Sequence, residues 1–218
     1  MVEIGDRTII GGDATINGHL FERDGIKIKF PEFAFYESFF ISYNEEKSKY
    51  KGVFSNVHSI HNKEVPVHKY YDLSIKAKNL DSTLYDKSLI ASINRYGRLV
   101  SEGGEYNNGW VKTKTRSFGE FMVTVDTIPP KIRALNVHDG KNIKNQKEIR
   151  ISIWDNFSGI DNYEAYINGE WVLFEYDAKY RSLTYYCDEH IQSGRNELVL
   201  KVRDEKYNES KMIISLYK

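Results

Sequence analysis

Three histidines lie close together in the sequence and are the first candidates for a metal site. His58, His61 and His68 are accompanied by Glu64 and Asp72. Tetrahedral zinc requires three or four converging ligands, and the helical His-Glu-x-x-His pattern is absent here. His58 and His61 lie between an expected strand and an expected turn, so their spacing does not force convergence. We therefore predict that these histidines are surface loop residues and that the chain has no zinc site.

Aspartates at the ends of expected strands could form a different metal site. Carboxylate oxygens are hard ligands that suit Ca²⁺, and in some sandwich domains they gather where strands end. The calcium candidates are Asp126, Asp155, Asp161 and Asp204. Aspartate also closes turns by accepting hydrogen bonds from nearby backbone amides, and the spacing of a calcium-binding loop is missing. Turn formation is our preferred interpretation, calcium is the alternative, and no other cofactor is expected.

No pattern of residues indicates nucleophilic catalysis. Cys187 alternates with Leu183 and Tyr185, which predicts a buried and unreactive thiol on the inner face of a strand. The Gly-x-Ser-x-Gly elbow of hydrolases does not occur, and the paired glycines at 11–12 and 103–104 are typical of turns. We therefore predict no catalytic or cofactor-binding residue and no enzymatic activity for this chain.

Aromatic side chains offer a binding surface instead. Tyr106, Trp110, Trp171 and Tyr176 could stack against a glycan or a peptide. The same side chains could equally fill a hydrophobic core, and the sequence does not decide between the two. An exposed cluster of them would indicate a binding face.

Composition restricts the class of partner. Among 218 residues, Lys+Arg and Asp+Glu both total 31, so the net charge is zero and gives no reason to expect a nucleic acid as partner. Apolar runs are only a few residues long, which predicts no transmembrane segment. The start of the chain lacks the basic and apolar parts of a signal peptide. The single cysteine excludes an internal disulfide.

The elements that must position these side chains are strands. Asp-Thr-Ile-Pro-Pro at 126–130 is a stiff, extended passage that cannot continue a sheet ladder. It divides a less regular β-sandwich domain at 1–126 from an immunoglobulin-like sandwich at 132–218, with 127–131 as the linker. Sixteen tyrosines also favour sheets over helices. The predicted fold class is all-β, with two sandwiches in tandem.

Alternating apolar residues give the second region about seven strands. Ile149, Ile151 and Ile153 alternate with polar or aromatic residues, and Asn168-Gly169 is a strong signal for a type I′ hairpin. The returning strand of that hairpin is expected over 171–176. Seven short strands in fewer than 90 residues are typical of an antiparallel sandwich. In the first region the clearest alternations begin at Ile26, Leu73, Leu89 and Phe121, and the polar stretch 79–87 is the one place where a helical turn is expected.

Several segments resemble a known family. These are the residues 126–132, the Asp-Asn-Phe-Ser-Gly-Ile at 155–160, the segment 163–177 and the Val-Arg-Asp at 202–204. Together with Gly-Trp-Val at 109–111 and the residues 117–121, they resemble the C-terminal β region of secreted lysostaphin-type zinc endopeptidases of Gram-negative bacteria. The resemblance covers most of 20–218.

The resemblance implies a function that the residues alone do not. In such proteins a peptidase domain with His-x-x-x-Asp and His-x-His motifs precedes the β modules and cuts peptidoglycan, and neither motif occurs here. This chain would then be a non-catalytic accessory region of an exported endopeptidase, periplasmic, secreted or in the cell envelope. Its partners would be its own N-terminal peptidase domain and cell-wall peptidoglycan or a surface glycan. The gene upstream would encode the export signal and the peptidase. The alternative is a stand-alone adhesion or glycan-binding module of the cell surface.

Overall fold

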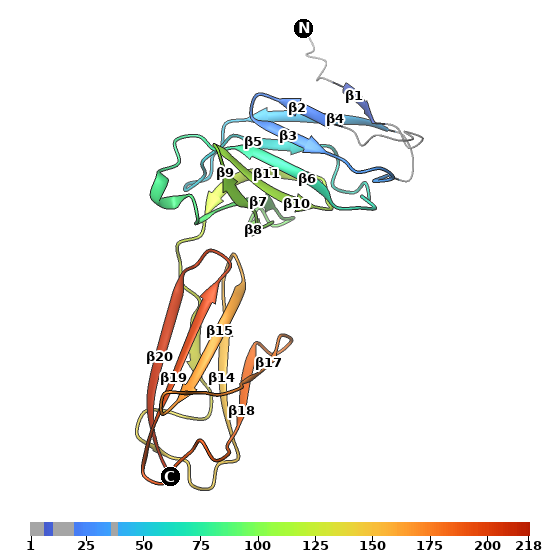
Figure 1. Ribbon diagram of the computed structural model, residues 1–218. Coiled ribbons are helices and arrows are strands. Elements are labelled where there is room, and N and C mark those ends of the chain that lie inside the picture. Colours follow the sequence, from blue (N-terminus) through green and yellow to red (C-terminus); the bar gives the residue numbers. More distant parts are fainter. Residues whose placement is uncertain (1–6, 11–19, 36–38) are drawn as a thin grey trace. The chain divides into compact units, whose positions relative to one another are not determined.

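The chain folds into two compact units, each built almost entirely of β-strands. The computed structural model describes residues 7–10, 20–35 and 39–218. The first unit spans Met1–Asp126 and the second Thr127–Lys218. Each unit is described by itself below (Figure 1).

The first unit contains two antiparallel sheets. The six-stranded sheet has the order β1-β4-β5-β11-β7-β8 and the five-stranded sheet the order β2-β3-β6-β10-β9. The strands of the first sheet are β1 (Arg7–Ile10), β4 (Phe39–Glu46), β5 (Val57–Ile60), β11 (Gly119–Val125), β7 (Ser88–Ile93) and β8 (Leu99–Ser101). Those of the second are β2 (Leu20–Arg23), β3 (Ile26–Lys29), β6 (Tyr71–Lys76), β10 (Trp110–Thr115) and β9 (Glu105–Asn107).

Alternation of side chains places the core of this unit between its sheets. Ile26 lies opposite Ile75 and Ile28 opposite Leu73 across β3 and β6, and all four are fully buried. Their polar neighbours along the strands face solvent, as period-two alternation requires. These strands therefore agree with the sequence prediction.

Two strands of the six-stranded sheet are buried on both faces. In β11 the side chains of Met122 and Thr124 are buried as well as those of Phe121 and Val123, and the buried run in β7 extends over four residues. The predicted one-sided alternation at Leu89 and Phe121 therefore describes only half of the burial.

The expected helical turn is the 3-10 segment η1 (Ser82–Leu84), where the Asp81 carboxylate accepts a hydrogen bond from the Thr83 amide.

The second unit is also a pair of sheets. One has the order β12-β14-β18-β17, and the other the order β13-β20-β19-β15-β16. The first consists of β12 (Lys131–Ala134), β14 (Glu148–Trp154), β18 (Ser182–Tyr186) and β17 (Glu175–Asp177). The second consists of β13 (Lys141–Asn142), β20 (Glu209–Tyr217), β19 (Arg195–Asp204), β15 (Ile160–Ile167) and β16 (Glu170–Trp171). All pairs are antiparallel except β13 with β20.

The hairpin at Asn168-Gly169 is present, but the strand that returns from it is not continuous. Both residues have positive φ angles, as a type I′ turn requires. The expected strand 171–176 instead divides into β16 and β17, which belong to different sheets. Between them Val172 and Phe174 are buried, whereas Trp171 and Leu173 are exposed. The chain therefore crosses the side of the sandwich from one sheet to the other. The buried side chains of Val172 and Phe174 hold this crossing segment against the core.

The structure confirms the all-β fold class and the two tandem sandwiches. Every residue of the second unit is described, and it contains nine strands rather than about seven, because the divided strand and the short β13 were not expected. The unit boundary follows Asp126, and β12 begins at Lys131, the last residue of the predicted linker. In the described part of the chain, no helix has the length and apolar composition needed to cross a bilayer.

Candidate functional site

A pocket of about 450 Å³ opens where the chain crosses the side of the second sandwich. Its apolar lining includes Trp171, Leu173 and Tyr186, which are 59%, 60% and 58% exposed. Its polar lining includes Asp188 and His190, which follow β18. A cluster of large apolar side chains that are this exposed is unusual on a protein surface and often marks a binding site. The combination of exposed rings with a few polar groups is typical of a small-ligand site.

Hydrogen bonds fix the polar groups of this pocket. Asp188 accepts from the Tyr185 hydroxyl and from the His190 backbone amide, and its carboxylate lies 2.9 Å from His190 Nδ1. This hydrogen bond to Asp188 raises the pKa of His190. Burial, together with the same aspartate, raises the pKa of the Tyr185 phenol. The imidazole and the carboxylate therefore act as a single oriented unit beside the exposed rings.

The four aromatic candidates do not form one platform. Tyr176 is 40% exposed, and its ring lies 6.0 Å from that of Tyr163. In the first unit, Tyr106 stacks on Tyr85 with ring centroids 3.8 Å apart. Trp110 is half-buried, with the Lys27 ammonium 5.1 Å from its centroid. Of the candidates, only Trp171 lies in a pocket with another exposed ring, that of Tyr186.

The aspartates at strand ends mainly close turns. Asp155 accepts from the amides of Phe157 and Gly159. Asp204 is fully buried and accepts from the amides of Lys206 and Asn208 and from the Asn208 side chain. These are the hydrogen bonds that the turn interpretation requires.

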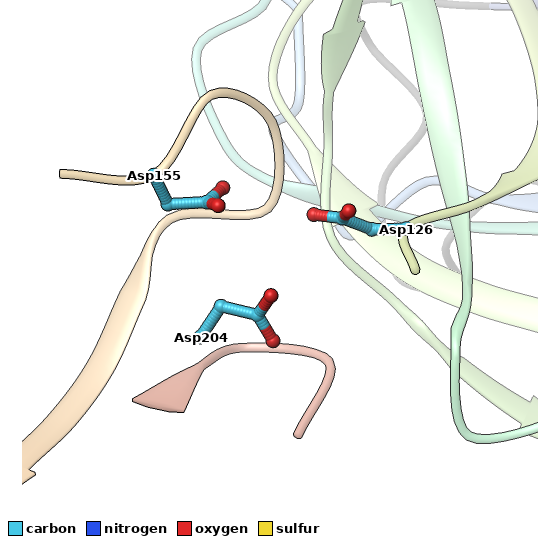
Figure 2. A group of neighbouring side chains, drawn as sticks. All are labelled: Asp126, Asp155 and Asp204. Carbon is cyan, nitrogen blue, oxygen red and sulfur yellow. The ribbon is translucent and has the colours of Figure 1, made fainter. Parts of the chain in front are cut away.

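Two of the calcium candidates come together in the second unit. Figure 2 shows Asp155, which follows β14, beside Asp204, the last residue of β19. Each offers a carboxylate oxygen within 4.8 Å of the other. Asp161 points elsewhere, because its carboxylate is bound by Arg203 at 2.7 Å. Asp126, also drawn in Figure 2, is the buried last residue of the first unit, and its amide donates to the Lys87 carbonyl. Calcium binding at these residues stays the alternative to turn formation.

The histidine predictions are wrong for His58. This residue lies in β5 and is fully buried, rather than in a surface loop. His61 is half-buried, with its ring edge-on to Phe118, and only His68 is exposed. Within the described residues, the three histidines do not converge into a group with metal-ligand spacing.

His58 is held in a small polar cluster inside the first unit. Its Nδ1 lies 2.8 Å from the Tyr43 hydroxyl, and its Nε2 is buried without a hydrogen-bond partner among the described residues. Burial lowers the pKa of His58 to about 4, against the opposing effect of Glu45, while Lys78 lowers it further. A side chain at Gly25 would have its Cβ 2.9 Å from His58 Cε1, so the backbone itself covers the ring. The imidazole is therefore neutral at pH 7 and closely packed.

Cys187 is less deeply buried than predicted. Leu183 and Tyr185 are buried as expected, which confirms the register of β18. Cys187 follows the strand, is half-buried and packs against the core, and burial raises the pKa of its thiol. A raised pKa leaves little thiolate at pH 7, so the side chain is poorly suited to nucleophilic chemistry.

Comparison with known proteins identifies the first unit. Residues 16–126, just over half of the chain, match the family described as the Zu5-like domain. The chain belongs to the Zu5-like domain family. No curated protein shows a significant sequence match.

Two solved structures are weakly similar to the Zu5-like chain. One is the endo-beta-1,4-mannanase from Thermotoga petrophila, with 17% identity and a TM-score of 0.36 over 42% of this chain and 20% of the mannanase. The other is the fibronectin(III)-like modules of Clostridium thermocellum CbhA, with 13% identity and a TM-score of 0.33 over 67% of this chain and 84% of that one. The chain thus spans only a fifth of the mannanase. Scores this low do not establish a shared fold.

Sequence reasoning missed both the polar half of the pocket and the buried cluster of the Zu5-like part. Asp188 and His190 lie in a loop without a motif, two residues apart. Tyr43 and His58 meet only through the pairing of β4 with β5, in which Glu45 lies opposite His58. The sequence contained one indication of the pocket, because it identified Trp171 as a possible binding residue. It did not show whether this ring is exposed or buried.

Proposed function

We propose that this chain is a non-catalytic accessory region that binds glycan at the Trp171 pocket and thereby positions a peptidoglycan-cleaving domain. The observation that carries the glycan part is the group of exposed rings beside the Asp188–His190 pair. The electron-rich face of an aromatic ring accepts the C–H face of a sugar, and nearby polar groups bind its hydroxyls. A shallow pocket on the side of a rigid sandwich can hold one or two such units without closing over them.

The rigid framework around the pocket supports this role. Phe174 and Tyr185 are buried beneath it with their rings 5.2 Å apart. The Tyr163 hydroxyl donates to the Phe174 carbonyl and holds the crossing segment in place. A preformed surface loses little conformational entropy when it binds, which matters for a ligand with few contacts.

The peptidase part of the proposal rests on the sequence resemblance. An accessory region contributes by setting where a catalytic domain meets its substrate, and this needs affinity rather than catalytic residues. Such a role places the protein in the periplasm, in the cell envelope or outside the cell. A stand-alone adhesion module would use the same pocket, so the two alternatives differ only in what else the gene encodes.

Polysaccharide binding tests the glycan part directly. The purified chain should be retained on peptidoglycan sacculi or on chitin, and Trp171→Ala should weaken retention at least about tenfold, equivalent to about 1.4 kcal/mol. Tyr96→Ala removes a ring of similar exposure (69%) from the other unit and should bind as well as the parent chain. No retention on any polysaccharide, or unchanged retention of Trp171→Ala, would contradict the glycan function.

The gene tests the peptidase part. The open reading frame upstream should encode an export signal and a domain with the His-x-x-x-Asp and His-x-His motifs. Two imidazoles and one carboxylate leave a zinc position open for the attacking water. A gene without such a domain would refute the peptidase role and leave the adhesion module.

A further inference from the structure

Carboxylates dominate the charge around the Trp171 pocket. Glu175 and Asp188 line it, and Glu170 lies 4.0 Å from His190 Nε2. His190 is the only basic side chain among the residues that line the pocket, all of which the structure describes. Even when His190 is protonated, these three carboxylates outnumber it, so these four side chains carry a net negative charge.

The carboxylates differ in what they already bind. Asp188 is engaged by Tyr185 and by His190, and Glu170 faces His190. Glu175 lies in β17 at the edge of its sheet, is exposed, and makes no ion pair or side-chain hydrogen bond with another described residue. Glu175 is therefore the carboxylate available to a ligand.

Two features of the pocket favour the same kind of group. A cation is attracted to the face of an aromatic ring, and Trp is the best of the aromatic residues for this interaction. A carboxylate at contact distance attracts an ammonium group and repels a second carboxylate. An uncharged sugar would use the rings and hydrogen bonds to its hydroxyls but would form no ion pair, and an acidic sugar would be repelled by Glu175.

From this combination we infer that the pocket selects a sugar unit with a free amino group, held by Trp171 stacking and by an ion pair to Glu175. The inference rests on the proposed glycan function and specifies its ligand. The sugar ring covers the exposed rings of Trp171 and Tyr186, and its ammonium group lies toward Glu175 and the Asp188–His190 pair. Acetylation of the amine removes the charge and with it the preference.

Calorimetry with matched oligosaccharides tests the inference. The probes are hexamers of glucosamine, of N-acetylglucosamine and of glucose, at low salt and at a pH where the amine is protonated. The glucosamine hexamer should bind about five- to tenfold more tightly than the acetylated one, and added salt should reduce this difference because it screens charge. Glu175→Gln should weaken binding of the glucosamine hexamer about fivefold and leave the acetylated hexamer unchanged. Glu189→Gln, which removes a neighbouring charge outside the pocket lining, should change neither.

The outcomes separate this inference from the function on which it rests. Equal or tighter binding of the acetylated hexamer, still dependent on Trp171, would refute the amine preference and keep the glycan function. Glucosamine binding that survives Trp171→Ala would refute the pocket as its site. Failure of all three hexamers to bind, together with no retention on polysaccharide, would refute both.

Discussion

The buried imidazole of His58 should make the first unit sensitive to acid. In the unfolded chain the pKa of a histidine is about 6.5. Burial lowers the pKa of His58 in the folded unit to about 4. Between these two values the unfolded chain binds a proton that the folded chain does not, so the free energy of unfolding falls as the pH falls. The stabilisation is complete above pH 7 and is lost progressively toward pH 4.

The size of the effect follows from the shift. One pKa unit corresponds to about 1.4 kcal/mol, so acidification from pH 7 to pH 4 should destabilise the first unit by about 3 kcal/mol through this residue alone. The facing groups are Glu45, which favours protonation, and Lys78, which opposes it. Tyr43, whose hydroxyl contacts Nδ1, stays neutral throughout because a phenol ionises only well above this pH range, and burial raises its pKa further.

Urea unfolding at several pH values measures this effect. Trp110 is in the first unit, whereas Trp154 and Trp171 are in the second, so a Trp154→Phe/Trp171→Phe background reports on the first unit by fluorescence. His58→Gln cannot titrate, and between pH 7 and pH 4 it should lose about 3 kcal/mol less than the parent chain. His68→Gln, at an exposed position, should retain the parent's pH dependence. Parallel curves for the parent and His58→Gln would refute the buried neutral imidazole.

Three further predictions concern packing and turns. Gly25→Ala should destabilise the first unit by about 1–3 kcal/mol in urea unfolding, because the new methyl group clashes with the His58 ring. If this contact is the cause, the same substitution should cost less in a His58→Ala background. Asp204→Ala should destabilise the second unit by at least about 2 kcal/mol, because it leaves buried amides without an acceptor. Asp161→Ala removes only a surface ion pair worth about 1 kcal/mol or less. Similar losses of stability for the two variants in thermal unfolding would contradict the turn assignment of Asp204. The Cys187 thiol should react slowly with a maleimide in the native protein and rapidly in urea, and rapid native labelling would show that the side chain is not packed against the core.

The fold was predictable wherever one face of a strand is apolar and the other polar. Ile26 and Ile28 alternate with lysines, and Ile149, Ile151 and Ile153 alternate with Arg150 and Ser152, and all of these isoleucines are buried. Period-two alternation specifies both the strand and its inner face, so these elements required no tertiary information.

The divided strand was not predictable, because its sequence is apolar on both faces. The run from Trp171 to Phe174 contains four consecutive apolar residues, of which two are buried and two exposed. An apolar run satisfies a continuous strand as well as a crossing segment, and only the positions of both sheets decide. The pocket depends on this crossing, so its location was hidden as well.

The buried histidine was hidden for a different reason. Val57 and His58 are adjacent and both buried, so β5 does not alternate at this point. The polar contact of His58 comes from Tyr43, on a neighbouring strand. A sequence shows residue types along one strand, whereas this cluster depends on the register between two.

The long pairing of β19 with β20 has a mechanical consequence. Ser210, near the start of β20, donates to the Pro130 carbonyl where the chain enters the second unit, and Lys218 follows the far end of the same strand. Entry and exit are therefore separated by most of a nine-residue strand, about 25–30 Å at the rise of an extended chain. Tension applied through the two ends acts along β20, parallel to its neighbours, and loads its ladders to β19 and β13 in shear. Hydrogen bonds loaded in this way must break together rather than one after another, so we expect the second unit to resist unfolding by a force applied between Pro130 and Lys218.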